Sequence, residues 1–164
     1  MTSFSDLLEL HQQLDELFLE HQRALMRLDL NRAASLLDDY ETRLLAHIRD
    51  EEDLMIPLYR QRAAAPIGAA AEIFLGEHEN LRRFLELFKE EIVRIKQSED
   101  IERGALFLMD SQHLFKRLLV HHDTREKKML YPLLDEVTTE SERQSLFQQF
   151  ESQPIAQTRA AAVD

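Results

Sequence analysis

The chain has 164 residues with no cysteine, three glycines and four prolines, and its formal net charge is −11. The lack of cysteine excludes disulfides, thiolate metal ligands and a cysteine nucleophile. The acidic charge argues against nucleic-acid binding, which needs a basic face. The first residues lack the pattern of a signal peptide, and no apolar run approaches the ~20 residues that span a bilayer. Composition therefore predicts a soluble, cytoplasmic protein with no membrane contact, rich in helix-forming residues.

Amphipathic segments follow one another along the chain, and their apolar residues recur in steps of three and four, typical of helices packed in a bundle. These segments cover residues 5–28, 37–58, 74–95 and 115–133. Polar residues predict turns at 29–31 and 97–100. Pro57 predicts a kink or loosened last turns in the second helix. Between the second and third segments, 63–71 is a low-complexity connection in which Pro66 is predicted to start a helix.

After the fourth segment, Thr139 and Glu142 have the spacing of a capping box before a short amphipathic helix. The apolar face of this helix consists of Leu146, Phe147 and Phe150. We expect this face to pack on the bundle, with packing on a partner chain, such as a homodimer, as the alternative. The predicted fold is all-α: an up-down-up-down antiparallel four-helix bundle with a short extra C-terminal helix. The predicted parts are the bundle at 1–136, the C-terminal helix at 137–151 and a flexible tail at 152–164.

The pattern H-x-x-x-E-x(5)-P occurs twice in this short chain. Its copies are His47, Glu51, Pro57 and His122, Glu126, Pro132. Positions i and i+4 share one face of a helix, so each copy directs an imidazole and a carboxylate to the same place. An offset of 75 residues superposes the two copies, and an offset of 67 superposes the first segment on the third. The two halves of the chain therefore repeat, and the repeated residues are of the metal-ligating types.

Hairpin geometry predicts which histidines meet. The midpoint between His11 and His47 is residue 29, and that between His78 and His122 is residue 100, so both midpoints fall in predicted turns. Each H-x-x-x-E pattern then faces a histidine of the neighbouring helix. Six candidate metal ligands result: His11, His47, Glu51, His78, His122 and Glu126. Buried glutamates are costly unless they are protonated, paired or bound to cations, so we favour a metal site over an ionic or hydrogen-bonded core.

Other polar residues lie on or near the helix faces that carry the candidate ligands, and we interpret them mainly as structural residues. His21 shares the face of the first helix, but its counterpart in the repeat is Phe88; we expect a structural histidine, with a ligand as the alternative. His113 is expected at the surface, and His121 is expected to face solvent or to stand behind the ligands. Tyr131, beside a proline, is expected in the core or at its boundary, with a hydrogen bond to a ligand as the alternative.

On these histidines and glutamates the chain resembles a hemerythrin-like (HHE cation-binding) domain over about residues 5–135. The resemblance implies a non-haem di-iron centre inside a four-helix bundle, with a bridging water, oxo or hydroxo group. It assigns His11 and His47 to one iron, His78 and His122 to the other, and Glu51 and Glu126 to bridging positions. Imidazole and carboxylate ligands also suit manganese and zinc, so the sequence leaves the metal open.

The chain departs from oxygen-carrying hemerythrins, whose third helix supplies H-x-x-x-H, because the positions four before and after His78 are Phe74 and Arg82. Glu126 also follows the last histidine by four residues instead of five. The resemblance therefore points to iron-centre repair, nitric-oxide handling, or oxygen or iron sensing, with O2 or NO as the small partner molecule. We expect a metal- and gas-binding protein more than a conventional enzyme. The alternative is a helical interaction or regulatory module whose metal is structural or absent.

Overall fold

The computed structural model describes residues 1–152, and every regular element in this part of the chain is helical. In chain order the elements are η1 (Phe4–Leu7), α1 (Leu8–Met26), α2 (Leu30–Asp50), η2 (Glu51–Met55), α3 (Ile56–Arg62), α4 (Ala71–Lys96), α5 (Ile101–Arg125), η3 (Glu126–Leu130), α6 (Tyr131–Val137) and α7 (Glu140–Phe147). The segment η1 is a 3₁₀ helix, whereas η2 and η3 are single π-helical turns. Apart from Ser152, the predicted tail lies outside the described residues.

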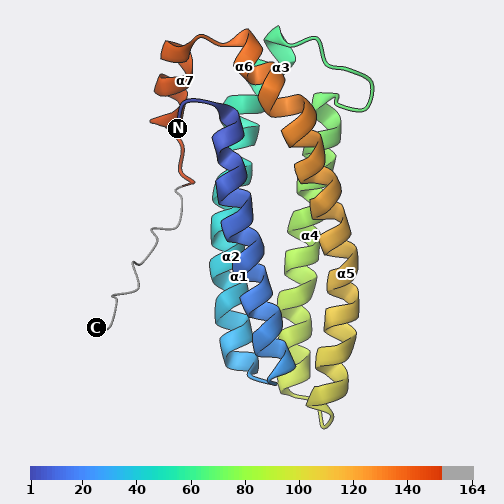
Figure 1. Cartoon of the computed structure of the whole chain (residues 1–164). Coiled ribbons are helices and arrows are strands. Elements are labelled where there is room, and N and C mark those ends of the chain that lie inside the picture. The colour runs from blue at the N-terminus through green and yellow to red at the C-terminus, as the bar shows by residue number, and fades with distance from the viewer. Residues whose placement is uncertain (153–164) are drawn as a thin grey trace, which may run out of the picture.

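The four long helices α1, α2, α4 and α5 lie side by side (Figure 1). Helix α1 packs on α2 and α4 packs on α5, while further contacts join α2 to α4 and α1 to α5. The short α1–α2 and α4–α5 turns lie at one end of the bundle, and α3, α6 and α7 lie at the other end with the N-terminus (Figure 1). The prediction of an all-α bundle is confirmed.

Both predicted turns are present and have the same construction. At the first turn the Asp29 side chain accepts a hydrogen bond from the Arg32 amide at 3.0 Å. At the second, the Asp100 side chain accepts one from the Arg103 amide, also at 3.0 Å. These N-caps satisfy backbone donors at the starts of α2 and α5 that have no partner within the helix. The turns thereby fix where each hairpin folds back.

The sequence predicted a kink or loosened turn at Pro57, and the structure shows a π-helical turn there and before its repeat Pro132. The amide of the residue before each proline donates across five positions, to the carbonyl of Glu51 in η2 and of Glu126 in η3. Each proline then falls in the first turn of the following helix, α3 or α6, where its missing N–H costs little. A π turn therefore directly follows each H-x-x-x-E pattern.

The prediction that Pro66 begins a helix is wrong. Helix α4 begins at Ala71, and Pro66 lies in a tight turn where its carbonyl accepts the Ala69 amide at 3.1 Å. Gly68 occupies the left-handed region with φ 85°, which residues with a side chain rarely adopt. The Tyr59 hydroxyl donates to the Ala69 carbonyl at 2.8 Å and fastens this connection to α3. Tertiary contacts at Ala69 thus delay the helix start.

The hydrophobic core has two clusters, one running through the bundle and one at the end that carries α3 and α6. The predicted metal ligands form a polar layer, and His78 shows where this layer lies relative to the two clusters. Phe74, one turn before it, belongs to the end cluster, and Leu81, one turn after it, belongs to the bundle cluster. The other three predicted histidine ligands also lie between residues of the two clusters along their helices. The polar layer is therefore closed by apolar side chains above and below.

Helix α7 packs on the end of the bundle. It starts with the predicted capping box, formed by Thr139 and Glu142. The ring of Phe147 lies edge-on to Phe4, with centroids 5.1 Å apart. Arg143 donates hydrogen bonds to the carbonyls of Asp135 and Thr138, which precede the helix, at 3.1 and 2.7 Å. It also donates to the carbonyl of Thr2, near the N-terminus, at 3.0 Å. The apolar face of α7 is therefore partly covered within the chain: Phe150 is buried, and Leu146 and Phe147 are half-buried.

The segment after α7 is held by a buried carboxylate. Asp50, which is 3% exposed, accepts the amides of Glu151 and Ser152, both at 2.8 Å, and the Ser152 hydroxyl. Phe150 is buried in the end cluster beside them. Asp50 is the residue before the π turn η2, so this contact joins the chain after α7 to the helix that carries Glu51.

Candidate metal centre

All six predicted ligands come together in one buried layer. The helices α1, α2, α4 and α5 each contribute a histidine, and the two π turns contribute the glutamates at their first positions. The six side chains are His11 (8% exposed), His47 (2%), Glu51 (0%), His78 (0%), His122 (3%) and Glu126 (0%). Their assignment as metal ligands remains a prediction. A metal site requires that its ligands converge, and these six side chains do.

The histidines meet in the pairs that hairpin geometry predicted. The rings of His11 and His47 have centroids 4.8 Å apart and an interplanar angle of 70°. Those of His78 and His122 are 4.9 Å apart at 77°. We call these the first and second histidine pairs. Their near-identical geometry shows that the sequence repeat is also a repeat of the site.

The glutamates lie between the two pairs. Glu51 Oε1 is 3.5 Å from His47 Nε2 of the first pair, and Glu51 Oε2 is 3.1 Å from His78 Nε2 of the second. Glu126 Oε2 is 3.6 Å from His11 Nε2, and Glu126 Oε1 is 2.8 Å from His122 Nε2. Each carboxylate thus reaches both pairs with different oxygens, an arrangement suited to sharing between two cations.

Tyr131 occupies the centre of the layer. Its hydroxyl is 3.0 Å from Glu51 Oε1, 3.1 Å from Glu126 Oε2 and 3.1 Å from His11 Nε2. The side chain is fully buried. The structure therefore shows the hydrogen-bonding alternative for this residue and not simple packing. Its repeat counterpart is Ile56, so this polar contact has no equivalent in the other half.

A carboxylate stands behind each histidine of the second pair, and sequence reasoning missed both. Behind His78, the Nδ1 atom lies 3.0 Å from Glu52 Oε1. Glu52 is in turn held by two hydrogen bonds from Arg82, at 3.0 and 2.6 Å. Glu52 is adjacent to Glu51, and Arg82 is one helical turn after His78, but neither spacing alone indicated this contact between helices.

The same arrangement stands behind His122. Its Nδ1 atom lies 3.0 Å from Glu77 Oε2, and Arg125 donates to the other oxygen of Glu77. Hydrogen bonds of this kind fix which ring nitrogen carries the proton, and they orient the other nitrogen toward a metal. In both histidines the free Nε2 therefore faces the glutamates.

The site also has buried polar atoms without hydrogen-bond partners among the described residues. These are His11 Nδ1, His47 Nδ1, Glu51 Oε2, His78 Nε2 and Glu126 Oε1. Three of them belong to the close nitrogen–oxygen contacts described above, so these atoms lie near one another without hydrogen-bond alignment. Unpaired buried polar atoms are costly. A cation beside the three inner atoms, Glu51 Oε2, His78 Nε2 and Glu126 Oε1, would offset their cost, and imidazole with carboxylate is a donor set that divalent metals accept.

The pKa values of the ligating side chains, considered without a cation, show the same cost of burying polar groups. Burial, together with the negative charge of Glu51, raises the pKa of Glu126 to about 8. Burial and the neighbouring His47 lower the pKa of His11 to about 3. Without a cation, this layer therefore favours a protonated glutamate and a neutral histidine. The neutral histidine can bind a metal directly. The protonated glutamate would release its proton when a metal binds.

A small cavity adjoins the first pair. Its volume is about 10 Å³, roughly enough for one water, and its walls include His11, His47 and His122. A surface groove of about 300 Å³ lies against α1 and α5. Three residues line both spaces: Asp15, Leu119 and Asp123. The groove therefore lies next to the cavity, with these three side chains forming walls of both.

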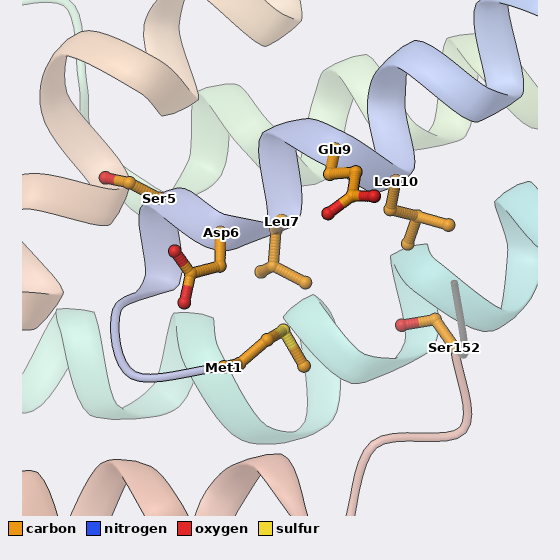
Figure 2. A pocket seen from close by; sticks show the side chains of 7 residues that line it. All are labelled: Met1, Ser5, Asp6, Leu7, Glu9, Leu10 and Ser152. Atoms are coloured by element: carbon orange, nitrogen blue, oxygen red, sulfur yellow. The ribbon is translucent and has the colours of Figure 1, made fainter. Parts of the chain in front are cut away.

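A larger pocket of about 340 Å³ lies elsewhere, where the N-terminal segment meets Ser152. Figure 2 shows its lining side chains, from Met1 to Leu10 and at Ser152, and none of the six predicted ligands is among them. Its size does not make it the candidate site, because it lacks a convergent set of ligating groups.

The remaining histidines are outside the layer. His21 is buried, and its Nδ1 lies 2.7 Å from the Ala33 carbonyl while its Nε2 lies 2.8 Å from Gln112. Both ring nitrogens are thus used in structural contacts, as expected. His113 and His121 are exposed.

Fold and site together define a helical bundle with a buried layer of histidines and glutamates suited to cations. The family model of the hemerythrin HHE cation binding domain matches residues 2–134, and the chain belongs to this family. The resemblance seen in the sequence is thereby confirmed. Searches among curated proteins and among solved structures gave no match. Within residues 1–152, no helix has the length and apolar character needed to cross a membrane.

Proposed function

We propose that this protein binds two iron ions in the buried layer and uses them to handle or sense a small diatomic molecule, O2 or NO. The observation that carries the proposal is the set of close but unaligned nitrogen and oxygen atoms in a buried layer. His11 and His47 would hold one ion, His78 and His122 the other, and Glu51 and Glu126 would serve both. Manganese and zinc fit the same donors. As part of this proposal, the four long helices that carry the ligands run alternately up and down along the bundle.

Bound iron would supply open coordination positions and a change of oxidation state. The chain itself limits what can arrive there. The cavity beside the first pair has a volume of only about 10 Å³, and Leu14, Leu44 and Leu119 contribute apolar walls. Such a space excludes organic substrates and suits a small molecule. The groove that shares Asp15 and Asp123 with the cavity is its route in this proposal.

Iron transfer, as in iron-centre repair, is a second use of the same site. The groove favours it because three acidic residues, Asp15, Glu16 and Asp123, line the space through which a cation would pass. The interaction-module alternative is favoured less, because Phe147 and Phe150 of its apolar face contact the end of the bundle.

The test is metal analysis of protein produced in iron-replete medium, with optical spectra recorded anaerobically, in air and with NO. We expect about two iron ions per chain and a spectral change with either gas. Glu51→Ala and Glu126→Ala should lose iron, whereas Glu79→Gln, an exposed residue of α4 paired with Arg83, should keep it. Iron below stoichiometry in the wild type, or full iron in both alanine variants, would contradict the proposal.

Gas handling and iron transfer give different results in the same preparation. Gas handling predicts that the spectrum responds to O2 or NO while the iron stays bound. Iron transfer predicts rapid loss of iron to a chelator such as ferrozine, slowed when Asp15 and Asp123 are changed to Asn. A spectrum unchanged by both gases, together with rapid loss of iron, would favour transfer.

A further inference from the structure

The rings of the two histidine pairs are arranged almost alike, although only His11 contacts the Tyr131 hydroxyl, and a larger difference lies behind the rings. Their inner geometry agrees to 0.1 Å in the distance between ring centroids, 4.8 against 4.9 Å. The difference lies at the Nδ1 atoms, which point away from the layer. In the second pair, each Nδ1 has a carboxylate partner at 3.0 Å, and an arginine holds each carboxylate.

The first pair has weaker support. Neither His11 Nδ1 nor His47 Nδ1 has a hydrogen-bond partner among residues 1–152. The carboxylate of Asp123 approaches His11 Nδ1 only to 3.5 Å. No arginine pairs with Asp123 among the described ion pairs. His47 is thus oriented by packing, and His11 by packing and the longer contact with Asp123, without the arginine-held carboxylates that hydrogen-bond the rings of the second pair.

The internal repeat shows where this difference comes from. By the 75-residue offset, the counterpart of Glu52 is Lys127, and by the 67-residue offset, the counterpart of Glu77 is Leu10. Lysine and leucine side chains offer no hydrogen-bond acceptor. The supporting arginines have also changed, since the counterpart of Arg82 is Asp15. The inner residues repeat, therefore, while the outer residues have diverged in a way that removes support from one half only.

Partners behind a ligating histidine orient its ring and increase its basicity, and their loss typically lowers metal affinity 10- to 100-fold. We infer that the two halves bind cations unequally, and that the second pair, His78 and His122, fills before the first pair. This inference rests on the proposed function, because it needs the layer to bind cations. It adds an order of filling, which the near-symmetric arrangement of the six ligands would not predict.

The test is a titration of the metal-free protein with Zn²⁺, which is diamagnetic and accepts imidazole ligands. The protein carries ¹⁵N-labelled histidine, and the ring nitrogens are followed by NMR, with each histidine assigned by substitution. We expect the signals of His78 and His122 to change over the first equivalent, and those of His11 and His47 over the second. Calorimetry of the same titration should show a stronger first step.

Glu52→Gln and Glu77→Gln should each weaken the first step by about 10- to 100-fold and leave the second step within a few-fold. Glu79→Gln, exposed on α4, is the matched control and should change neither step. Circular dichroism of the metal-free variants checks folding, and the wild-type NMR result decides the order of filling without any variant.

Simultaneous changes in both pairs, or earlier changes in the first pair, would overturn the order of filling while leaving the proposed function intact. A first step unaffected by either glutamine variant would likewise contradict the role of Glu52 and Glu77. If no Zn²⁺ binds in the layer, the proposed cation site fails, and the inference fails with it. The two failures are therefore distinguishable.

Discussion

The change Glu126→Gln should stabilise the metal-free protein at alkaline pH while weakening metal binding. Glu126 is fully buried, and burial and the charge of Glu51 raise its pKa to about 8, against 4.5 for an ordinary glutamate. The folded chain therefore prefers the protonated side chain. Glutamine has nearly the shape of protonated glutamate but cannot ionise, so it avoids a buried negative charge that the wild type acquires as the pH rises.

The sign and size follow from proton linkage. Because the folded-state pKa is raised, the contribution of Glu126 to stability is fully present below about pH 4.5 and is lost as the pH rises through about 8. At about 1.4 kcal/mol per pKa unit, the loss between pH 5 and pH 8 is about 3 kcal/mol. The free energy of unfolding of Glu126→Gln, relative to wild type, should rise by this amount over the same interval.

The assay is urea unfolding in the presence of a chelator, at pH 5 and pH 8, followed by circular dichroism. Comparing variant with wild type at each pH cancels the contributions of titrating groups that do not contact Glu126. Glu79→Gln is the control, because its exposed carboxylate should show no comparable change. A variant that gains no stability relative to wild type between the two pH values would refute the reasoning.

Three further predictions concern stability and local order. Tyr131→Phe removes the hydroxyl that contacts Glu51 and Glu126, and should lower the free energy of unfolding of the metal-free protein by about 1–3 kcal/mol in urea; an unchanged midpoint would count against this role. Asp50→Ala should speed amide hydrogen exchange at Ser152 about 10-fold or more, and wild-type protection in the variant would exclude the contact as its cause. Saturation with Zn²⁺ at about 100 times the dissociation constant should stabilise the protein by about 2.7 kcal/mol, and removal by a chelator should reverse the gain.

Much of the site could be predicted because it depends on local geometry that repeats. The i, i+4 spacing placed His47 and Glu51 on one face, and the turn at residue 29 placed His11 opposite them. The structure agrees, with His11 and His47 as close neighbours at 2.8 Å between their Nε2 atoms. His21 contacts a backbone carbonyl, which agrees with the structural role predicted from its counterpart Phe88. Helix periodicity and hairpin symmetry need no tertiary information.

Tyr131 could not be placed in this way because it depends on the π turn. In a regular α-helix a residue five positions after Glu126 points to a different face. The i→i+5 hydrogen bond of η3 adds a residue to the turn, so that Tyr131 follows Glu126 on nearly the same face and reaches the layer. The proline at 132 marks a disturbed helix, but it does not tell which kind of turn replaces it.

Glu52 and Glu77 escaped prediction for a different reason. Their contacts to His78 and His122 cross from one helix to another, and they depend on how far each helix is rotated about its axis. Sequence periodicity determines which face is buried, but not which residue at the edge of that face meets a given neighbour. The start of α4 was misplaced similarly, because contacts with Tyr59 outweighed the preference of Pro66.

The divergence of the outer residues has a consequence for how the two hairpins recognise each other. Glu52 of the first hairpin meets Arg82 of the second, with hydrogen bonds at 3.0 and 2.6 Å. If two copies of the first hairpin paired instead, Glu52 would face Asp15, the counterpart of Arg82, and two acidic groups would repel. Two copies of the second would set Lys127 against Arg82. A chain built from two similar halves thus disfavours the pairing of like with like, so each hairpin is matched to the other kind and not to a copy of itself.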